Sequence, residues 1–296
     1  MKKNIGVIAA AFLAAAALTA CGGSKPAETT AAETKAEAAE TTAAEAESSE
    51  AEAKTDDLKE LTVGASPAPH AEILEAAREE LAKKGYDLKI VEYTDYVQPN
   101  LALSDKDLDA NFFQHLPYLE AFLKDHRLNL VSAGAVHIEP MGVYSKKVKN
   151  LTDLKKGASV AIPNDPTNGG RALQVLAAAG LIKMKDGVGV NGTPLDITDN
   201  PKRIRIVEVE AATLPRALDD LDAAVINSNY ALGAKLNPTK DSIAIEAKDS
   251  PYANVVAVRA GDENKPAIKE LMSSLHSPEV KKFIGEKYNG AVVPAF

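Results

Sequence analysis

The chain of 296 residues contains no tryptophan and a single cysteine, Cys21. One cysteine cannot form a disulfide within the chain, so a disulfide-linked fold is excluded and the hydrophobic core must supply the stability. Aromatic residues make up only 5% of the chain, so a local group of them is informative. The residues after position 57 are numerous enough for one large domain or two modest ones.

Several signatures of catalysis and metal binding are also missing. The chain contains no HExxH motif and no Pro-Cys-x-x-Cys, which disfavours zinc proteases and zinc deaminases. A nucleophile elbow would need a final glycine where the run Gly64-Ala65-Ser66-Pro67-Ala68 ends in alanine. The histidines stand singly in the sequence, at positions 70, 115, 126, 137 and 276. We therefore expect neither an enzyme nor a metal-binding protein, and no cofactor.

The amino terminus has the pattern of a bacterial export signal that ends at a lipid attachment site. Lys2 and Lys3 precede an apolar run at residues 5–20, which is shorter than the roughly 20 residues that span a bilayer. The run ends in Leu-Thr-Ala before Cys21 and resembles the lipobox of bacterial lipoproteins. We predict cleavage of the signal at 1–20 and acylation of Cys21, which anchors the protein to the cell membrane on its extracytoplasmic side. A plain secretory signal with an incidental cysteine is the alternative.

Residues 21–57 are predicted to be a tether between the lipid and the folded body. Residues 24–57 consist mainly of Ala, Glu, Thr and Ser, with ten acidic residues against three lysines. This composition buries too little apolar surface to offset the entropy of ordering, so we predict disorder. Most of the formal net charge of −8 lies in this segment, and the body lacks the basic excess expected of a nucleic-acid-binding protein.

After residue 57 the sequence alternates strand-like and helix-like segments, which predicts an α/β fold. The first pass has strands at 61–65 and 88–91, helices at 69–84 and 116–126, and extended chain at 128–138. The second pass has strands at 158–162, 204–209, 223–226, 243–245 and 255–258, and helices at 166–179, 214–221 and 266–288. Two similar passes indicate two α/β lobes with a ligand cleft between them.

Two segments combine residues that suit the two ends of a small ligand. Residues 109–119 gather Phe113 and Tyr118 around His115, which favours either an aromatic wall for an apolar group or part of the core. Residues 161–171 run from a strand through a glycine-rich turn into a helix. Free N–H groups at such a helix start, together with Arg171, suit a carboxylate, unless the helix is simply capped and Arg171 lies at the surface.

A third segment, residues 224–231, ends a predicted buried strand at Asn227. An amide offers both a donor and an acceptor, which suits the ammonium or the carboxylate of a zwitterion. An asparagine at a strand end is also common in turns, so this signal is weak by itself.

Six segments together resemble the NlpA/MetQ family of methionine-binding lipoproteins. They are EYTDYVQPN at 92–100, DANFFQHLPYL at 109–119, VAIPNDPTNGGRAL at 160–173, LPRALDD at 214–220, AVINSNYA at 224–231 and SPYANVV at 250–256. The match covers residues 60–296 in order. The resemblance implies a type II periplasmic-binding-protein fold, with two α/β lobes joined by two crossovers. We therefore expect lobe 1 at 58–140 plus 251–296 and lobe 2 at 141–250. It also implies a lipid-anchored monomer that captures methionine and delivers it to the permease of an ABC importer.

The resemblance further implies the ligand site. The residues that resemble those around the ligand side chain are Tyr96, Phe113, His115 and Tyr118. Arg171 resembles the residue that binds the ligand carboxylate. Asn168, Asn227 and Asn254 resemble residues that make polar contacts with the ligand. A thioether packs well on aromatic edges. Because the chain has no tryptophan, any indole in the pocket of family members is absent here. The ligand therefore stays open between L-methionine, D-methionine, another apolar amino acid and a methionine-containing dipeptide. An adhesin without a small ligand is the remaining alternative.

Overall fold

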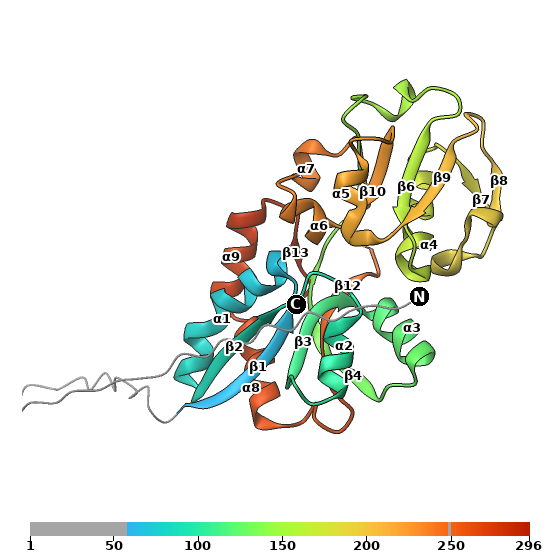
Figure 1. The fold of residues 1–296 in the computed structure, drawn as a ribbon. Helices are drawn as coiled ribbons and strands as arrows, with labels where there is room; N and C mark the ends of the chain where they lie inside the picture. The colour runs from blue at the N-terminus through green and yellow to red at the C-terminus, as the bar shows by residue number, and fades with distance from the viewer. Residues whose placement is uncertain (1–57, 248–249) are drawn as a thin grey trace, which may run out of the picture. The chain divides into compact units, whose positions relative to one another are not determined.

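The computed structural model describes residues 58–247 and 250–296, which contain two central sheets (Figure 1). The predicted signal, Cys21 and the tether lie outside the described residues. Among the helices of the described residues, none has the length and apolar character needed to cross a membrane.

The first sheet has six strands in the order β13-β4-β12-β3-β1-β2. The strands are β1 (Lys59–Ala65), β2 (Tyr86–Glu92), β3 (Ala110–His115), β4 (Leu130–Ile138), β12 (Ala253–Arg259) and β13 (Val293–Pro294). Strand β1 pairs parallel with β2 and β3, whereas β12 pairs antiparallel with β3 and β4. The carboxy-terminal part of the chain therefore completes a sheet that the first part begins.

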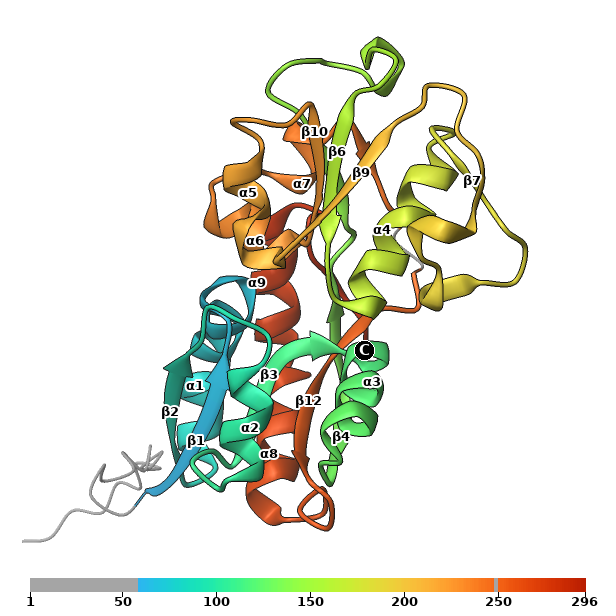
Figure 2. The same cartoon turned by 45° about the vertical axis from the view of Figure 1, so that its right-hand side comes forward.

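Helices cover both faces of the first sheet (Figure 2). They are α1 (Glu72–Lys83), α8 (Pro266–Leu275) and α9 (Pro278–Tyr288) on one face, and α2 (Gln98–Ser104) and α3 (Leu116–His126) on the other. On the first face, Ile73, Leu271 and Ile284 belong to one buried apolar cluster with residues of β1 and β12. Burial of such side chains contributes roughly 1.5–3 kcal/mol each, so this face alone is a substantial core.

The second sheet has five strands in the order β11-β5-β10-β6-β9. The strands are β5 (Gly142–Tyr144), β6 (Ser159–Pro163), β9 (Arg205–Val209), β10 (Ala223–Ile226) and β11 (Ala244–Ile245). The longer elements on its faces are α4 (Pro166–Ala178) on one side and α5 (Leu214–Ala217) with α6 (Ser228–Gly233) on the other. A short helix α7 (Pro238–Asp241) and a two-stranded sheet of β7 (Lys183–Met184) and β8 (Ile197–Asp199) complete this part.

The chain crosses between the two sheets twice. It leaves the first sheet after Ile138 and enters the second at Gly142, and it returns between Ile245 and Ala253. The mixed α/β architecture is as predicted. The lobe limits expected at residues 140 and 251 fall within these two connections, and the division of the chain into lobes at those residues stays a prediction.

Two predictions of secondary structure are wrong in detail, and one helix was not predicted. The expected helix at 266–288 is two helices, because Ser277 caps a new helix by accepting from the Val280 N–H at 3.2 Å and Pro278 begins it. The expected helix at 214–221 ends at Ala217, after about one turn. The helix α2 was not predicted, because seven residues are too few for a clear helical period.

Candidate functional site

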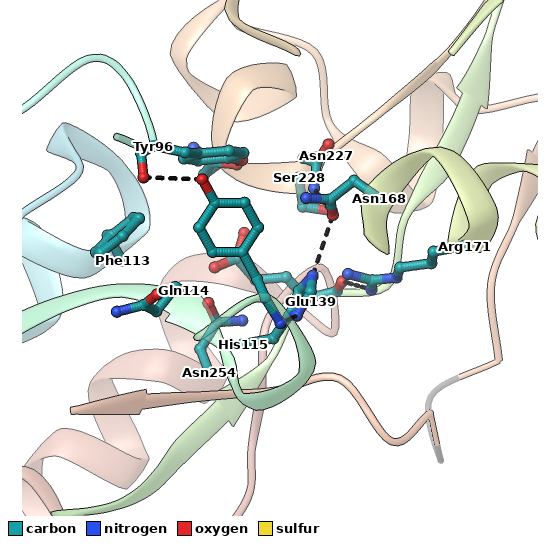
Figure 3. Close-up of a pocket in the computed structure, with 12 residues that line it drawn as sticks. Tyr96, Phe113, Gln114, His115, Glu139, Asn168, Arg171, Asn227, Ser228 and Asn254 are labelled. Carbon is teal, nitrogen blue, oxygen red and sulfur yellow. Dashed lines mark hydrogen bonds between the residues drawn. The ribbon is translucent and has the colours of Figure 1, made fainter. Parts of the chain in front are cut away.

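A cavity of about 340 Å³ lies where the ends of the two sheets meet (Figure 3). Its lining comes from both sides of the crossovers and consists of Tyr96, Phe113, Gln114, His115, Tyr118, Glu139, Asn168, Arg171, Asn227, Ser228, Asn229 and Asn254. All eight side chains singled out from the sequence are in this lining. The structure thus brings together residues up to 158 positions apart, while their role as ligand contacts stays a prediction.

The carboxyl end of β3 delivers the aromatic side of the cavity. His115 ends the strand and caps α3, because its Nδ1 accepts from the Tyr118 N–H at 3.1 Å. Its other ring nitrogen must then carry the proton, and it donates to Asn168 Oδ1 at 3.1 Å. Burial and the nearby Arg171 charge lower the pKa of His115 to about 3, so the ring is neutral near pH 7.

Three aromatic rings form a continuous wall in the cavity. The ring of Tyr96 lies 6.0 Å from that of Phe113 and 5.7 Å from that of Tyr118. Tyr118 donates to the Tyr96 carbonyl at 3.0 Å, and Tyr96 donates to Asn229 Oδ1 at 2.6 Å. Burial raises the pKa of both phenols, so they remain protonated donors. These bonds hold the rings in place and leave their faces as the apolar surface of the site.

Arg171 is 2% exposed, so the alternative of a surface arginine is wrong. Its Nε donates to Glu246 Oε1 at 3.0 Å, and its Nη2 donates to the Glu139 carbonyl at 2.7 Å. The guanidinium also lies 4.2 Å from the centre of the Tyr252 ring. Within the described chain, Nη1 donates no hydrogen bond. Arg171 is therefore held rigidly by its own partners and keeps one nitrogen for another group.

The helix start before Arg171 differs from the expectation. Asp165 caps α4 by accepting from the Asn168 N–H at 2.9 Å, so this N–H is not free for a ligand anion. The two glycines allow close packing instead. A Cβ on Gly170 would lie 2.1 Å from the carbonyl oxygen of Val190, and one on Gly169 would lie 2.9 Å from that of Pro163. The glycine-rich turn thus lets α4 approach the backbone, and Arg171 is the cationic group it presents.

Amide side chains complete the polar side of the cavity. Asn227 donates through Nδ2 to Asn168 Oδ1 at 2.8 Å, and its own Oδ1 is buried without a partner in the described residues. Asn254 Oδ1 lies 3.1 Å from His70 Nε2, while its Nδ2 donates no hydrogen bond within the same part of the chain. A buried acceptor without a donor is costly, so these amides are ready to bind a polar ligand group.

Sequence reasoning missed four lining residues and two supporting ones. The missed lining residues are Gln114, Glu139, Ser228 and Asn229, and the supporting ones are Glu246 and Tyr252, which contact Arg171. Glu139 directly follows a strand and is 5% exposed. An acidic residue at a strand end was visible in the sequence, but its burial depends on the packing of both sheets.

Two histidines that stand singly in the sequence lie together in the fold. The rings of His70 and His137 are 4.9 Å apart, and their Nε2 atoms and a Glu139 oxygen lie within 4.8 Å of one another. Metal-binding imidazoles normally donate their second N–H to an acceptor, whereas Nδ1 of both rings has no partner among the described residues. The contacts to Glu139, at 3.2 and 2.8 Å, are hydrogen-bond distances. The cluster is therefore better explained as hydrogen-bonded than as a metal site.

Two α/β lobes, two crossovers and a polar, aromatic cavity between the sheets define a substrate-binding protein of the type II periplasmic class. Residues 61–296 match the model of the NlpA lipoprotein family. The chain belongs to the NlpA lipoprotein family.

Relatives in sequence carry related names. The methionine-binding lipoprotein MetQ of Bacillus subtilis is 47% identical over 241 residues, which cover 80% of this chain and 88% of the relative. The D-methionine-binding lipoprotein MetQ of Escherichia coli K12 is 44% identical over 240 residues, with 80% and 89% covered. Outer membrane lipoprotein 2 of Mannheimia haemolytica is 42% identical over 296 residues, with 99% and 98% covered.

Solved structures agree with this assignment. A nutrient-binding protein of Burkholderia cenocepacia, bound to methionine, superposes with a TM-score of 0.78 at 50% identity, and the match covers 80% of this chain and all of the other. The lipoprotein Tp32 of Treponema pallidum superposes with a TM-score of 0.77 at 42% identity, with 80% and 99% covered. The fold and the family predicted from the sequence are confirmed.

Proposed function

We propose that this protein binds methionine outside the cytoplasmic membrane and delivers it to an ABC importer. The observation that carries the proposal is the composition of the cavity lining. Arg171 and Asn227 offer a donor and an acceptor unused by the described residues, and the rings of Tyr96, Phe113 and Tyr118 offer apolar surface. A free amino acid with an apolar side chain needs these two kinds of surface side by side.

The polar end of the cavity suits the zwitterionic part of the ligand. A carboxylate that leaves water must be compensated, and Arg171 can do so through Nη1 because its other nitrogens are already held. The Asn254 amide nitrogen can donate to the same carboxylate. Asn227 Oδ1 can accept from the ammonium, which would satisfy an acceptor that is buried without a partner in the described residues.

The aromatic end suits a thioether. Sulfur packs favourably against aromatic edges, and an unbranched side chain adapts to an irregular wall. The methionine bound to the Burkholderia cenocepacia protein and the names of the MetQ relatives support this choice over other apolar amino acids. Some relatives are named for methionine and others for D-methionine. Both enantiomers should therefore be titrated to determine the stereochemistry of the ligand.

The lining of the cavity favours a single amino acid over a dipeptide. Asn168 Oδ1 already accepts from His115 and from Asn227, and Tyr96 donates to Asn229, so most polar side chains of the lining are paired with one another. A methionine-containing dipeptide would need extra space and further polar partners for its peptide group. We therefore rank the dipeptide below free methionine, and another apolar amino acid between them.

The test of this function is a titration of the full chain after its bound ligand has been stripped by unfolding and refolding. We expect micromolar or tighter binding of L-methionine, corresponding to about −8 kcal/mol or more, and weaker binding of leucine and of glycyl-methionine. Binding of none of these compounds would contradict the proposal. Chemical turnover of methionine, followed by mass spectrometry, would instead favour an extracytoplasmic enzyme.

We also propose that Cys21 carries the lipid that holds the protein at the cell membrane, where it meets the importer permease as a monomer. Relatives named as lipoproteins support the anchor. Changing Cys21 to Ser removes the sulfur that is acylated, so we expect the variant to leave the membrane fraction and to lose the mass of the acyl chains. A variant that stays in the membrane fraction with the parent's mass would contradict lipid attachment at Cys21.

A further inference from the structure

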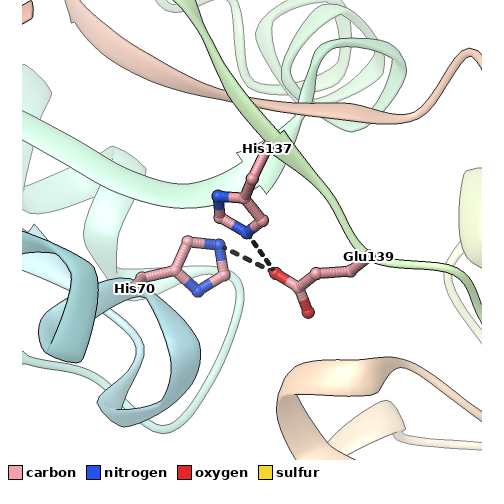
Figure 4. Close-up of side chains that lie close together, drawn as sticks. All are labelled: His70, His137 and Glu139. Atoms are coloured by element: carbon pink, nitrogen blue, oxygen red, sulfur yellow. Dashed lines mark hydrogen bonds and ion pairs between the residues drawn. The ribbon is translucent and has the colours of Figure 1, made fainter. Parts of the chain in front are cut away.

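A buried polar cluster of His70, His137 and Glu139 adjoins the cavity, because Glu139 belongs to the cavity lining (Figure 4). His137 Nε2 lies 2.8 Å and His70 Nε2 lies 3.2 Å from the same oxygen of Glu139, Oε1. The three side chains are almost completely buried, with exposures of 1% for His70, 0% for His137 and 5% for Glu139. Only Glu139 belongs to the cavity lining. The two imidazoles thus contact the carboxylate from the side of the core.

The cluster joins parts of the chain that are far apart in sequence. His70 lies in the helical turn Pro67–Ala71 before α1, His137 lies near the end of β4, and Glu139 follows that strand in the first crossover. His70 Nε2 also lies 3.1 Å from Asn254 Oδ1, on β12. One imidazole therefore holds two cavity residues, Glu139 and Asn254, in a constant relation to each other.

The protonation of the imidazoles follows from their surroundings. Burial lowers the pKa of His70 to about 4 and that of His137 to about 3, so both rings are neutral near pH 7. A neutral ring has one N–H, and Nδ1 of each ring has no partner among the described residues. The proton therefore belongs on Nε2, where it can be donated to Glu139 Oε1. Two N–H donors on one oxygen favour the ionised carboxylate.

The negative charge of Glu139 is not neutralised by a cationic side chain. Within the described chain, no lysine or arginine nitrogen lies within 4.0 Å of its carboxylate. Arg171 donates to the backbone carbonyl of Glu139, but its side-chain partner is Glu246. A buried carboxylate that faces a cavity and has only neutral donors gains most from a cation in that cavity.

We propose that Glu139 is the counter-charge for the ammonium group of the bound amino acid, and that His70 and His137 are positioning residues that aim its carboxylate into the cavity. This inference rests on the proposed function, because it assigns one polar group of that same ligand. It adds a charged acceptor to the neutral one of Asn227. A ligand without an ammonium group, however well its carboxylate and side chain fit, should then be rejected.

The assignment has a consequence for pH. Burial raises the pKa of Glu139 from its ordinary value, and protonation of the carboxylate removes the attraction for a cation. Methionine affinity should therefore fall as the pH falls toward the raised pKa, before ordinary carboxylates titrate. The titratable and charged groups that act on Glu139 are His70 and Arg171, and His137 contacts its carboxylate, with Tyr96 and Tyr288 nearby.

The first experiment uses the ligand-stripped full chain without any substitution. Affinity is measured from pH 8 to pH 5 for L-methionine and for its α-hydroxy analogue, which keeps the carboxylate and the thioether but lacks the ammonium. We expect methionine to bind at least about thirtyfold more tightly at pH 8, with a difference that shrinks as the pH falls. Equal affinity for both compounds, or parallel pH profiles, would overturn the inference even though methionine binds. Failure of both compounds to bind would instead overturn the proposed function.

The second experiment tests the two kinds of residue separately. Glu139→Gln keeps the shape but removes the charge, so methionine binding should weaken by about thirtyfold or more while the α-hydroxy analogue changes less than about threefold. His137→Leu removes one N–H donor and should shift the acid limb of the methionine profile to higher pH. His137→Gln can supply an N–H donor near the Nε2 position of the histidine. It should therefore shift the acid limb of the methionine profile back toward that of the parent.

Binding of the α-hydroxy analogue reports whether each variant is folded. His276→Gln serves as the matched control, because His276 is exposed and contacts the Ala135 carbonyl away from the cavity lining. It should leave both profiles unchanged. If Glu139→Gln binds methionine as tightly as the parent, Glu139 is not the counter-charge. If His137→Leu keeps the parent's profile, the imidazole does not position the carboxylate.

Discussion

At the scale of single residues, Arg171 combines two tasks that usually fall to different side chains. Its contacts with Glu246, Tyr252 and the Glu139 carbonyl make it part of the packing of the second crossover, and its remaining nitrogen faces the ligand in our proposal. A change at Arg171 will therefore affect both the fold and the binding, and the two effects must be measured separately.

Arg171→Ala removes the cation that we assign to the ligand carboxylate. We expect methionine binding to weaken by about 3–5 kcal/mol, roughly a hundredfold to several thousandfold. The measurement is calorimetric titration with methionine and leucine, together with urea unfolding. Phe113→Ala is the comparison, because it should cost less and should narrow the preference for methionine over leucine. Parent-like methionine affinity in a folded Arg171→Ala would refute the carboxylate assignment.

The neutral histidines make stability depend on pH. The pKa of His115 is lowered to about 3 in the fold, against about 6.5 in an unfolded chain, so the unfolded state binds the proton between these values. The free energy of unfolding should therefore decrease as the pH falls below about 6.5, by up to about 1.4 kcal/mol per pH unit for this group.

His115→Asn tests this dependence with the helix cap preserved, since asparagine is also a good N-cap. Urea unfolding of ligand-free protein between pH 7 and pH 4 should give a smaller slope for the variant than for the parent. The exposed His276 provides the control substitution, His276→Gln. An unchanged slope in His115→Asn would mean that His115 does not titrate as its burial implies.

At the scale of elements, helix α4 depends on its glycines for its position. Gly170 lies against the backbone carbonyl of Val190, and a Cβ would come within 2.1 Å of that oxygen. Because backbone atoms cannot move aside cheaply, α4 or the segment around Val190 must shift. Arg171 is the next residue, so a shift of the helix also moves the guanidinium.

Gly170→Ala should destabilise the protein by about 1–3 kcal/mol, as overpacking does, and should weaken methionine binding. Gly285→Ala, inside α9, is the matched control, because a Cβ there meets no atom within 4 Å. Glycine in a helix interior costs roughly 0.5–1 kcal/mol relative to alanine, so this control should be neutral or stabilising. The free energy of unfolding of both variants is measured with urea. Equal effects of the two substitutions would mean that the contact with Val190 does not fix the position of α4.

At the scale of the two lobes, side chains already bridge the cavity. Tyr96 donates to Asn229 at 2.6 Å, and His115 donates to Asn168 at 3.1 Å, each bond joining residues that precede and follow the first crossover. Such bridges form only when the lobes are close together. Motion about the two connections is the ordinary way in which ligands enter this class of protein.

We predict that the stripped protein opens and that methionine closes it, with hinges near residues 139–145 and 249–253, of which residue 249 lies outside the described residues. Small-angle scattering should give a smaller radius of gyration after methionine is added. The variant Arg171→Ala, at the same methionine concentration, should keep the open value. Identical curves for stripped and methionine-loaded parent protein would contradict closure, provided that mass spectrometry confirms that the ligand has been removed.

Much of the local structure could be predicted from the sequence. Helix α3 and strand β10 occupy the predicted ranges, since proline near the helix start and a short buried apolar run are signals carried by neighbouring residues. The family could be predicted as well, because six long motifs occur in order. Predictions failed where a short-range signal was weak, as in α2, or was overridden, as at Ser277.

Eight of the twelve residues that line the cavity could be named from the sequence, whereas the partners of these residues were decided by the tertiary structure. Tyr96, Phe113, His115 and Arg171 could be named because their segments carry recognisable motifs. The sequence alone does not show that Glu246 pairs with Arg171, or that His70 and His137 both contact Glu139. These contacts join residues that lie between 2 and 75 positions apart in the chain. Charge pairing and burial are properties of such contacts. The electrostatics of the cavity therefore depend on how the two sheets pack together and could not be predicted from the sequence.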